Sequence, residues 1–319
     1  MKRIGVLCSG GDTPGMNAAV RSVVMKAHTL GMEVLGIRHG YRGLLEGQIL
    51  PLSAQDVRGI SHLGGTVLKT ARCKAFEERS GQMQGLVMAK AFDLEGIVAI
   101  GGDGTLRGAA EFSEMGVPMI GLPGTIDNDM AYTDFTIGFD TAVNGIMLDL
   151  NRVWDTMLSH DRVGVVEVMG RACGNIALWA GLAGEMDFIL TPEAGFDIEA
   201  LCAKLRKDRI TGRLTSMIMV AEGVGSGEDI AQAIRERTDI EVKSVVLGYT
   251  QRGGSPTVQD RILAARLGQR AVELLYNDQG NRAVGMKDGQ LIDLPLDEAT
   301  AKQRNFDQEL LALAKLLSE

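Results

Sequence analysis

Short runs of apolar residues alternate with segments of helical period along the whole chain. The apolar runs do not alternate with polar residues, as they would in a strand with one solvent-exposed face. Continuous apolar runs are typical of strands that helices cover on both sides. We predict strands at residues 3–9, 33–37, 96–100, 118–122, 162–168, 187–190, 216–221 and 242–247. Helical patterns include residues 16–30, 106–114, 140–158, 198–209 and 261–276. This order predicts an α/β protein with two Rossmann-like lobes and mostly parallel sheets.

The composition is that of a folded protein. The chain has 319 residues, of which 45% are hydrophobic and 23% are charged. Disorder is therefore excluded as the main state, and at roughly 150 residues per domain the length predicts about two domains. The formal net charge of −8 argues against a broad nucleic-acid-binding surface. No apolar stretch approaches the roughly 18 residues that span a bilayer, so we expect neither a nucleic-acid nor a membrane partner.

The cysteines, at positions 8, 73, 173 and 202, form no Cys-x-x-Cys pair and no zinc-binding spacing. Apolar neighbours predict that Cys8 and Cys173 are buried thiols. This cysteine usage predicts a reduced, cytoplasmic protein.

Two of the predicted strands end in the same Gly-Gly-Asp sequence, at residues 4–12 and 97–104. Glycine lets backbone N–H groups approach a phosphate, and the helix that follows adds its positive N-terminus. Neither loop is a Walker A or G-x-G-x-x-G loop. The first loop, 9–17, is explained about as well by a tight strand-to-helix turn. In the second, Asp103 suits a Mg²⁺ ion that bridges nucleotide phosphates, or the N-cap of the following helix.

A third loop, LPGTIDND at residues 122–129, carries two carboxylates two positions apart. Asp127 and Asp129 can serve as a base and its electrostatic partner, although turn formation alone explains such residues nearly as well. Cations lie near strand ends or glycines at Arg72, Arg162, Arg171, Lys243 and Arg252. Each alone is typical of a solvated surface, but together they predict binding of small anions such as phosphate.

Six motifs in a fixed order closely resemble the bacterial ATP-dependent 6-phosphofructokinases. They are SGGDTPGMNAA (9–19), IGGDGT (100–105), LPGTIDND (122–129), VEVMGR (166–171), AEGV (221–224) and QRGGSP (251–256). The similarity covers essentially the whole chain. IGGDGT alone is a weak signal, because NAD kinases and lipid kinases of related fold carry GGDGT as well.

The resemblance implies phosphoryl transfer from MgATP to the 1-hydroxyl of fructose 6-phosphate, with ADP and fructose 1,6-bisphosphate as products. We expect an ATP-binding lobe from residues 1–138 and about 252–305. A fructose 6-phosphate-binding lobe is expected from residues 139–251 and 306–319, with the active site in the cleft between the lobes. The family forms homotetramers, which is therefore implied here.

The family's site residues carry over position by position. The aspartate matching Asp127 is the base that takes the proton from the sugar hydroxyl, and the one matching Asp103 holds Mg²⁺. Further catalytic candidates are Gly11, Arg72, Thr125, Asp129 and Arg171. Nucleotide-contacting positions are Gly11, Arg72, Cys73, Gly102, Asp103, Gly104 and Thr105. Sugar-contacting positions are Thr125, Asp127, Met169, Gly170, Arg171 and Glu222. The sugar 6-phosphate positions are Arg162, Lys243, Tyr249 and Arg252, with Arg162 and Lys243 supplied by a neighbouring subunit.

A few positions indicate which phosphoryl donor the protein uses and how strongly it binds the sugar phosphate. Pyrophosphate-using relatives carry Asp and Lys where Gly104 and Gly124 stand, so ATP is the expected donor. Most family members have His in place of Tyr249 and Arg in place of Lys243. Lysine lacks the bidentate fork of arginine, which predicts weaker binding of the sugar phosphate. Cys73 replaces an aromatic residue near the nucleotide.

The positions of the family's effector site differ more. They fall on Arg21, Met25, Trp154, Gly184, Glu185, Asp187 and Arg213. Basic residues are usual where Met25, Ala54, Trp154 and Thr211 stand, Gly59 replaces an Asp, and Asp187 replaces a Glu. Because several phosphate-binding charges are missing, we predict weak allosteric control.

Two other functions stay open. One is a related kinase with another acceptor, such as tagatose 6-phosphate or NAD, although an NAD kinase does not explain LPGTIDND and QRGGSP. The other is a catalytically silent phosphosugar-binding or regulatory subunit. Such a subunit is expected to have lost Asp103 or Asp127, and both are present.

Overall fold

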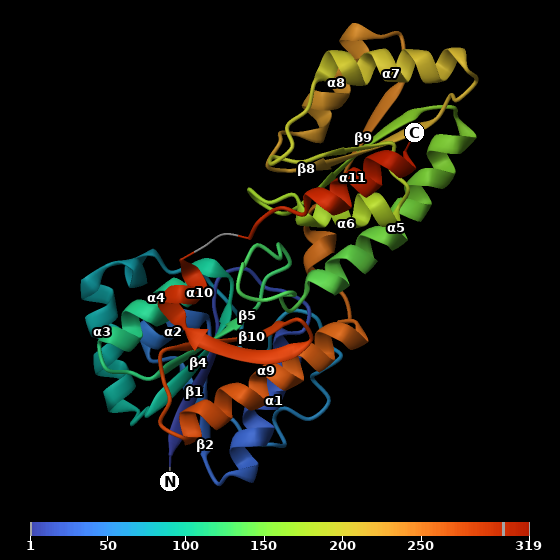
Figure 1. Cartoon of the computed structure of the whole chain (residues 1–319). Coiled ribbons are helices and arrows are strands. Elements are labelled where there is room, and N and C mark those ends of the chain that lie inside the picture. The colour runs from blue at the N-terminus through green and yellow to red at the C-terminus, as the bar shows by residue number, and fades with distance from the viewer. Residues whose placement is uncertain (1, 302–303, 319) are drawn as a thin grey trace. The chain divides into compact units, whose positions relative to one another are not determined.

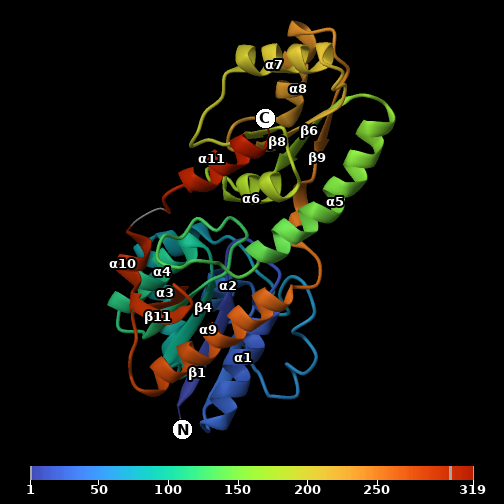
Figure 2. The same cartoon turned by 45° about the vertical axis from the view of Figure 1, so that its right-hand side comes forward.

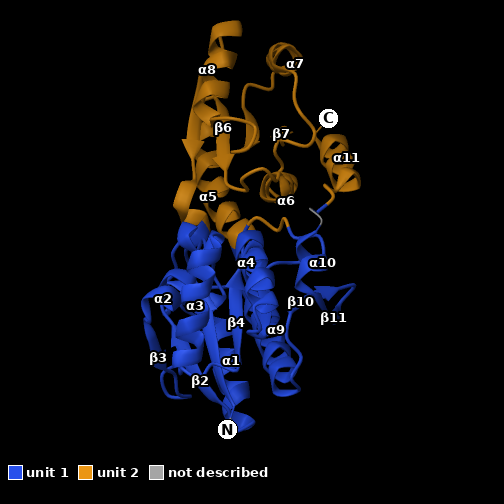
Figure 3. Cartoon of the chain, turned by 90° about the vertical axis from the view of Figure 1, so that its left-hand side faces the viewer, with its two compact units in different colours: residues 1–126, 130–141, 252–304 blue, residues 127–129, 142–251, 305–319 orange. Residues whose placement is uncertain are grey.

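The computed structural model describes residues 2–301 and 304–318. The chain divides into two compact units (Figure 3). Unit 1 contains residues 1–126, 130–141 and 252–304, and unit 2 contains residues 127–129, 142–251 and 305–319. The chain passes from unit 1 into unit 2 within one long helix, α5 (Phe139–Ser159).

Unit 1 is built on a seven-stranded sheet within its described residues, in the order β11-β10-β5-β4-β1-β2-β3. Its strands are β1 (Arg3–Cys8), β2 (Glu33–Ile37), β3 (Ile49–Pro51), β4 (Gly96–Gly101), β5 (Met119–Pro123), β10 (Arg282–Lys287) and β11 (Gln290–Pro295). The inner strands pair in parallel, whereas β3 and β11 add antiparallel edges. The prediction of mostly parallel sheets is therefore confirmed, and the antiparallel edge strands were not predicted.

Helices cover both faces of this sheet. One face packs against α1 (Met16–Thr29) and α9 (Val258–Tyr276), which lie side by side in Figures 1 and 2. Against the other face lie α2 (Gly40–Glu46), α3 (Arg79–Ala91), α4 (Asp103–Glu114), α10 (Leu296–Thr300) and the 3₁₀ helix η1 (Lys74–Glu77). Side chains of β1 alternate between the two cores, with Val6 in one and Leu7 in the other. Burial on both faces explains why the strands lack polar alternation.

Unit 2 holds a smaller sheet, whose described strands are all parallel, in the order β7-β8-β6-β9. Its strands are β6 (Val163–Val168), β7 (Phe188–Leu190), β8 (Ser216–Ala221) and β9 (Val242–Val246). Helices α7 (Ile198–Ile210) and α8 (Gly227–Arg237) pack on one face. Helix α6 (Asn175–Ala183) packs against β7 and β8 and also against α11 (Gln308–Leu317), and the 3₁₀ helix η2 (Gly248–Arg252) follows β9.

The predicted elements agree with the observed ones to within a few residues at their ends. The largest shifts are at the N-termini of α4 and α9, which begin three residues earlier than predicted. Both begin in loops whose glycine and threonine residues carry no apolar periodicity. Thr257 caps α9 by accepting a hydrogen bond from the Asp260 N–H group, which explains its earlier start.

All the cysteines are free thiols. Cys8 is buried, as predicted, but Cys173 is only partly buried, so that prediction is wrong in degree. Cys173 lies in the loop before α6, where its neighbour Ala172 is exposed. None of the helices in residues 2–301 and 304–318 is long and apolar enough to cross a membrane.

Candidate active site

The first glycine-rich loop joins β1 to α1 in unit 1. Gly10 and Gly15 have positive φ angles of 87° and 103°, which residues with a Cβ rarely adopt. The Thr70 hydroxyl donates to the Gly10 carbonyl at 2.9 Å, and the Gly10 N–H group donates to the Ala71 carbonyl at 3.3 Å. These contacts bring Arg72, which is exposed, and the partly buried Cys73 into the neighbourhood of the loop. The structure thus places the residues just before Arg72 and Cys73 against the loop that carries Gly11.

Arg252 lies against the same loop. A Cβ at Gly11 would lie 2.5 Å from Nη1 of Arg252, so only glycine lets this guanidinium approach so closely. The Asp12 carboxylate is 4.0 Å from the same nitrogen. The Arg252 side chain is 17% exposed, which indicates that it packs onto the loop rather than extending into solvent.

The second glycine-rich loop joins β4 to α4, also in unit 1. Gly102 is the N-cap of α4 and Asp103 is its first residue, so the alternative interpretation of Asp103 as the N-cap is wrong. The Asp103 carboxylate forms an ion pair with Arg107, one helical turn away, and is 34% exposed. The buried Thr105 hydroxyl donates to the Ser9 carbonyl at 3.0 Å. Thr105 therefore ties the two glycine-rich loops together.

The third loop crosses from unit 1 into unit 2 after Ile126. Thr125 stays with unit 1, where its carbonyl accepts a hydrogen bond of 2.6 Å from the Thr136 hydroxyl. A Cβ at Gly102 would lie 3.6 Å from the Thr125 Cβ, so this residue borders the second glycine-rich loop. Asn128, with a φ of 49°, turns the chain, and its carbonyl accepts from the Asn175 amide at 2.8 Å.

The predicted base, Asp127, is buried and faces a cation. Its side chain is 4% exposed, and one carboxylate oxygen lies 3.4 Å from Nε of Arg171. The Arg171 side chain is 53% exposed, so the guanidinium reaches from solvent to a buried carboxylate. Both residues belong to unit 2. A buried carboxylate beside a guanidinium at a loop is suited to activating a hydroxyl group next to a phosphate.

The loop that carries Arg171 is held by two side-chain acceptors, the partly buried Glu222 and the buried Gln251. One Glu222 oxygen accepts from the Arg171 N–H group at 2.7 Å and from the Gly170 N–H group at 3.2 Å. Gly170 has a φ of 138°, and a Cβ there would lie 2.3 Å from the Cys173 carbonyl oxygen. The amide of Gln251, which is 2% exposed, accepts from the Met169 N–H group at 3.0 Å. Gln251 was not predicted as a site residue, because a glutamine next to arginine in a loop gives no sign of burial.

Two of the predicted sugar-phosphate cations meet in unit 2. Glu241 lies 2.8 Å from Nη2 of Arg162 and 3.2 Å from Nζ of Lys243. The hydrogen bond from Arg162, followed by that from Lys243, lowers the pKa of Glu241. Residues 163 and 242 are direct neighbours in the β6–β9 pairing, which explains why the flanking side chains converge. Tyr249 is 82% exposed on η2 of the same unit, whereas Arg252 belongs to unit 1.

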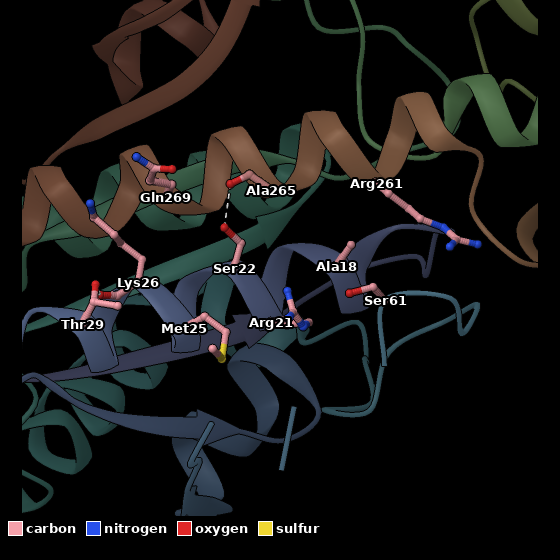
Figure 4. A pocket seen from close by; sticks show the side chains of 10 residues that line it. All are labelled: Ala18, Arg21, Ser22, Met25, Lys26, Thr29, Ser61, Arg261, Ala265 and Gln269. Atoms are coloured by element: carbon pink, nitrogen blue, oxygen red, sulfur yellow. Dashed lines mark hydrogen bonds between the residues drawn. The ribbon is translucent and has the colours of Figure 1, made fainter. Parts of the chain in front are cut away.

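The predicted effector positions fall into two groups. Arg21 and Met25 line a groove of about 390 Å³ along α1 and α9, together with Ser22, Lys26, Arg261 and Gln269 (Figure 4). In unit 2, the Trp154 indole donates to the Gly184 carbonyl at 3.2 Å. The buried Asp187 carboxylate forms an ion pair with Arg213 and accepts from the Met217 N–H group. Burial, the largest effect, raises the pKa of Asp187.

A match to the family model described as Phosphofructokinase covers residues 3–275. A protein of Alkaliphilus metalliredigens named ATP-dependent 6-phosphofructokinase is 49% identical over 318 residues, which is 100% of each chain. A protein of the same name from Clostridium botulinum is 48% identical over 319 residues, again over the full length of both.

Solved structures agree in fold. Phosphofructokinase from Saccharomyces cerevisiae matches with a TM-score of 0.88 and 33% identity over 99% of this chain. The match spans 47% of the yeast chain, about half its length. A pyrophosphate-dependent phosphofructokinase from Marinobacter aquaeolei matches with a TM-score of 0.86 at 22% identity, covering 97% of this chain and 86% of that one, a likeness of fold alone. The order of the motifs, the two mostly parallel sheets and the full-length similarity lead to one conclusion: the chain belongs to the phosphofructokinase family.

Proposed function

We propose that this chain transfers the terminal phosphoryl group of ATP to the 1-hydroxyl of fructose 6-phosphate. The products are ADP and fructose 1,6-bisphosphate. The proposal is supported by relatives named ATP-dependent 6-phosphofructokinase that are 48–49% identical over the whole chain. The observation that carries it is the buried Asp127 carboxylate beside the Arg171 guanidinium.

Asp127 accepts the proton of the sugar 1-hydroxyl as that oxygen forms a bond to the terminal phosphorus and the bond to ADP breaks. Phosphoryl transfer needs little covalent help from a protein, so the remaining groups position reactants and stabilise charge. Arg72, Arg171 and the Gly11 N–H group stabilise negative charge on the group in transfer. Thr125 and Asp129 are proposed to orient the reactants, and Met169, Gly170 and Glu222 to hold the sugar.

Asp103 is the proposed magnesium ligand. Mg²⁺ is often held by one or two carboxylates, with the rest of its shell from water and substrate phosphates, so the partly exposed Asp103 carboxylate fits it. Nowhere in the described part of the chain do three or more His, Cys, Asp or Glu side chains gather in a group that could hold a metal ion. When bound, Mg²⁺ supplies charge neutralisation on the nucleotide phosphates. Arg107 holds the Asp103 carboxylate in place beforehand.

The donor is proposed to be ATP. A Cβ at Gly104 would meet nothing within 4 Å, so this glycine leaves open space beside the second glycine-rich loop. Gly124 contributes differently, because a Cβ there would lie 3.0 Å from Cγ2 of Ile100 and 3.3 Å from Cε of Met16. A larger residue at 124 would displace core side chains. Support for ATP over pyrophosphate therefore rests mainly on Gly104.

Arg162, Lys243, Tyr249 and Arg252 are proposed to bind the sugar 6-phosphate, with the first two supplied by a neighbouring subunit of a homotetramer. Glu241 holds Arg162 and Lys243 together within this chain, as required if they act as one unit on another subunit's ligand. We further propose a cytoplasmic enzyme of glycolysis with weak allosteric control. In support of weak control, the Arg213 guanidinium is engaged by Asp187.

The test is a coupled assay of purified protein with fructose 6-phosphate, Mg²⁺ and either ATP or pyrophosphate. Turnover with ATP alone, lowered by about 10²–10⁴-fold in Asp127→Ser, supports the donor, the acceptor and the base together. Asp129→Ser in parallel distinguishes the base from its neighbour. Turnover with pyrophosphate overturns the choice of donor. If fructose 6-phosphate is inactive but tagatose 6-phosphate is phosphorylated, the alternative acceptor is correct, and binding without turnover favours a silent subunit.

A further inference from the structure

A buried carboxylate outside the proposed reaction lies at the start of α9. Asp260 is 1% exposed. Its Oδ1 accepts from the Gly138 N–H group at 2.8 Å, and its Oδ2 accepts from the Thr141 N–H group at 2.8 Å. The Thr141 hydroxyl also donates to Oδ2. Asp260 thus caps the N-terminus of α5 from a different helix.

Burying the Asp260 carboxylate costs free energy, so its stability in the fold depends on the groups that donate hydrogen bonds to it. Desolvation, the largest effect, raises the pKa of Asp260, and the hydrogen bonds from Thr141 and Gly138 oppose it. The positive ends of α5 and α9 also favour a carboxylate at this place. Removing one donor or the charge leaves buried polar groups without compensation, and the segments that meet here are expected to loosen.

The hydrogen-bond network of Asp260, Gly138 and Thr141 packs tightly against the first glycine-rich loop. The Thr13 hydroxyl donates to the Ile137 carbonyl at 3.0 Å. A Cβ at Gly138 would lie 1.5 Å from the Thr13 Oγ1, and a Cβ at Gly15 would lie 2.6 Å from Cγ2 of Ile137. Residues 13–15 therefore rest directly on residues 137–138, which Asp260 holds.

The network also reaches the segment that carries Arg252. The Thr257 N–H group donates to the Thr141 hydroxyl at 3.0 Å, and the Thr257 hydroxyl donates to the Asp140 carboxylate at 2.6 Å. Arg252, five residues before Thr257, packs its guanidinium onto Gly11. The two segments that meet at Gly11 and Arg252 are thus both anchored on the Asp260 network.

We infer that Asp260 is a positioning residue of the phosphotransferase site: it touches no reactant, but it sets the first glycine-rich loop and Arg252 relative to each other. The inference rests on the proposed function, since Gly11 and Arg252 are proposed there to contact the reactants. It goes beyond that function in assigning to a buried carboxylate on α9 a role in the geometry of the loop after β1.

Two pairs of variants test it. Asp260→Asn keeps the size but directs an amide N–H group at either the Gly138 or the Thr141 N–H group. Thr141→Val removes the shared hydroxyl, and Thr141→Ser restores it. The control, Asp197→Asn, changes a carboxylate that accepts from the Glu199 and Ala200 N–H groups at the N-cap of α7 in unit 2. Steady-state kinetics well below each variant's Tm and hydrogen exchange by mass spectrometry are measured on all four.

For Asp260→Asn and Thr141→Val we expect kcat/KM for ATP to fall by between ~10-fold and ~100-fold, the loss typical of misplaced reactant contacts. Hydrogen exchange should rise at residues 9–17 as well as at 137–142. Thr141→Ser should restore both, and Asp197→Asn, which keeps its capping oxygen, should leave kcat/KM and exchange at 9–17 unchanged. The inference is overturned if Asp260→Asn and Thr141→Val lower Tm with kcat/KM and exchange at 9–17 unchanged. If Asp260→Asn does not fold, the comparison of Thr141→Val with Thr141→Ser tests the inference by itself. If the wild-type protein shows no turnover, the proposed function is refuted, not this inference.

Discussion

At the scale of single residues, burial controls the chemistry of Cys173. Desolvation by burial, together with the nearby carboxylates of Glu193, Asp129 and Asp127, raises the pKa of this thiol to about 12. At pH 8 the reactive thiolate fraction is therefore about 10⁻⁴. We expect Cys173 to resist iodoacetamide at pH 8 in the native protein and to react once it is unfolded in urea. Mass spectrometry of the peptide measures both rates, and fast native alkylation would contradict the argument.

The sugar-phosphate residues carry a second prediction at this scale. Lys243 shares Glu241 with Arg162, and Tyr249 is exposed on η2. Lys243→Arg provides a bidentate fork and Tyr249→His provides a partly charged donor, so each should lower KM for fructose 6-phosphate by about two- to tenfold. The KM for ATP, measured in parallel, serves as the control. If neither substitution lowers KM for the sugar, these residues do not bind its phosphate.

At the scale of elements, Gln251 joins η2 to the loop after β6. Its amide accepts from the Met169 N–H group and donates to the Gly248 carbonyl, each at 3.0 Å. Gln251→Leu leaves both partners unpaired, at a cost of about 1–3 kcal/mol each in the free energy of unfolding. We expect a lower urea midpoint and a raised KM for fructose 6-phosphate. Gln232→Leu on the exposed face of α8 is the matched control and should change neither. An unchanged midpoint in Gln251→Leu would refute the role of this contact.

The pattern of apolar residues predicts some elements of the fold and misses others. The apolar runs predict the positions of β1, β2, β4, β5, β6 and β8, because burial on both faces leaves a continuous apolar signal. The helical period of apolar residues predicts α1. The strands β3, β10 and β11 were not predicted. The antiparallel edge strands β3 and β11 have no buried residue, so they carry no continuous apolar signal. The sequence also did not predict the cap of α5. The capping residue, Asp260, lies on α9, about 120 positions along the chain from the N–H groups that it accepts from.

At the scale of the whole molecule, the proposed site depends on an assembly. If Arg162 and Lys243 serve a neighbouring subunit, the active form is a tetramer with four times the mass of the chain. Light scattering during size-exclusion chromatography measures this mass, and activity should fall with dilution when the tetramer dissociates. A fully active monomer would contradict both the tetramer and the shared site.

Regulation belongs to the same scale. Arg21 and Met25 line a groove on unit 1, and Arg213 is engaged by Asp187 in unit 2. Because Lys26 in this groove pairs with Glu273 and Arg213 pairs with Asp187, we expect ADP and phosphoenolpyruvate at low millimolar concentration to change KM for fructose 6-phosphate by less than about twofold. The measurement is a sugar saturation curve with and without each effector, and strong activation or inhibition would overturn the prediction.

The sequence by itself determined the α/β class, the positions of eight of the described strands, the three site loops and membership of the phosphofructokinase family. These follow from local patterns, because continuous burial, tight turns and loop glycines each need particular residues at neighbouring positions. Only the tertiary structure showed that Arg171 reaches the buried Asp127, that Glu241 joins Arg162 to Lys243, and that Asp260 holds the ends of two helices. The contacts Asp127–Arg171, Arg162–Glu241 and Gly138–Asp260 join residues from about 40 to 120 positions apart, and they depend on how the chain packs, which local residue patterns do not specify.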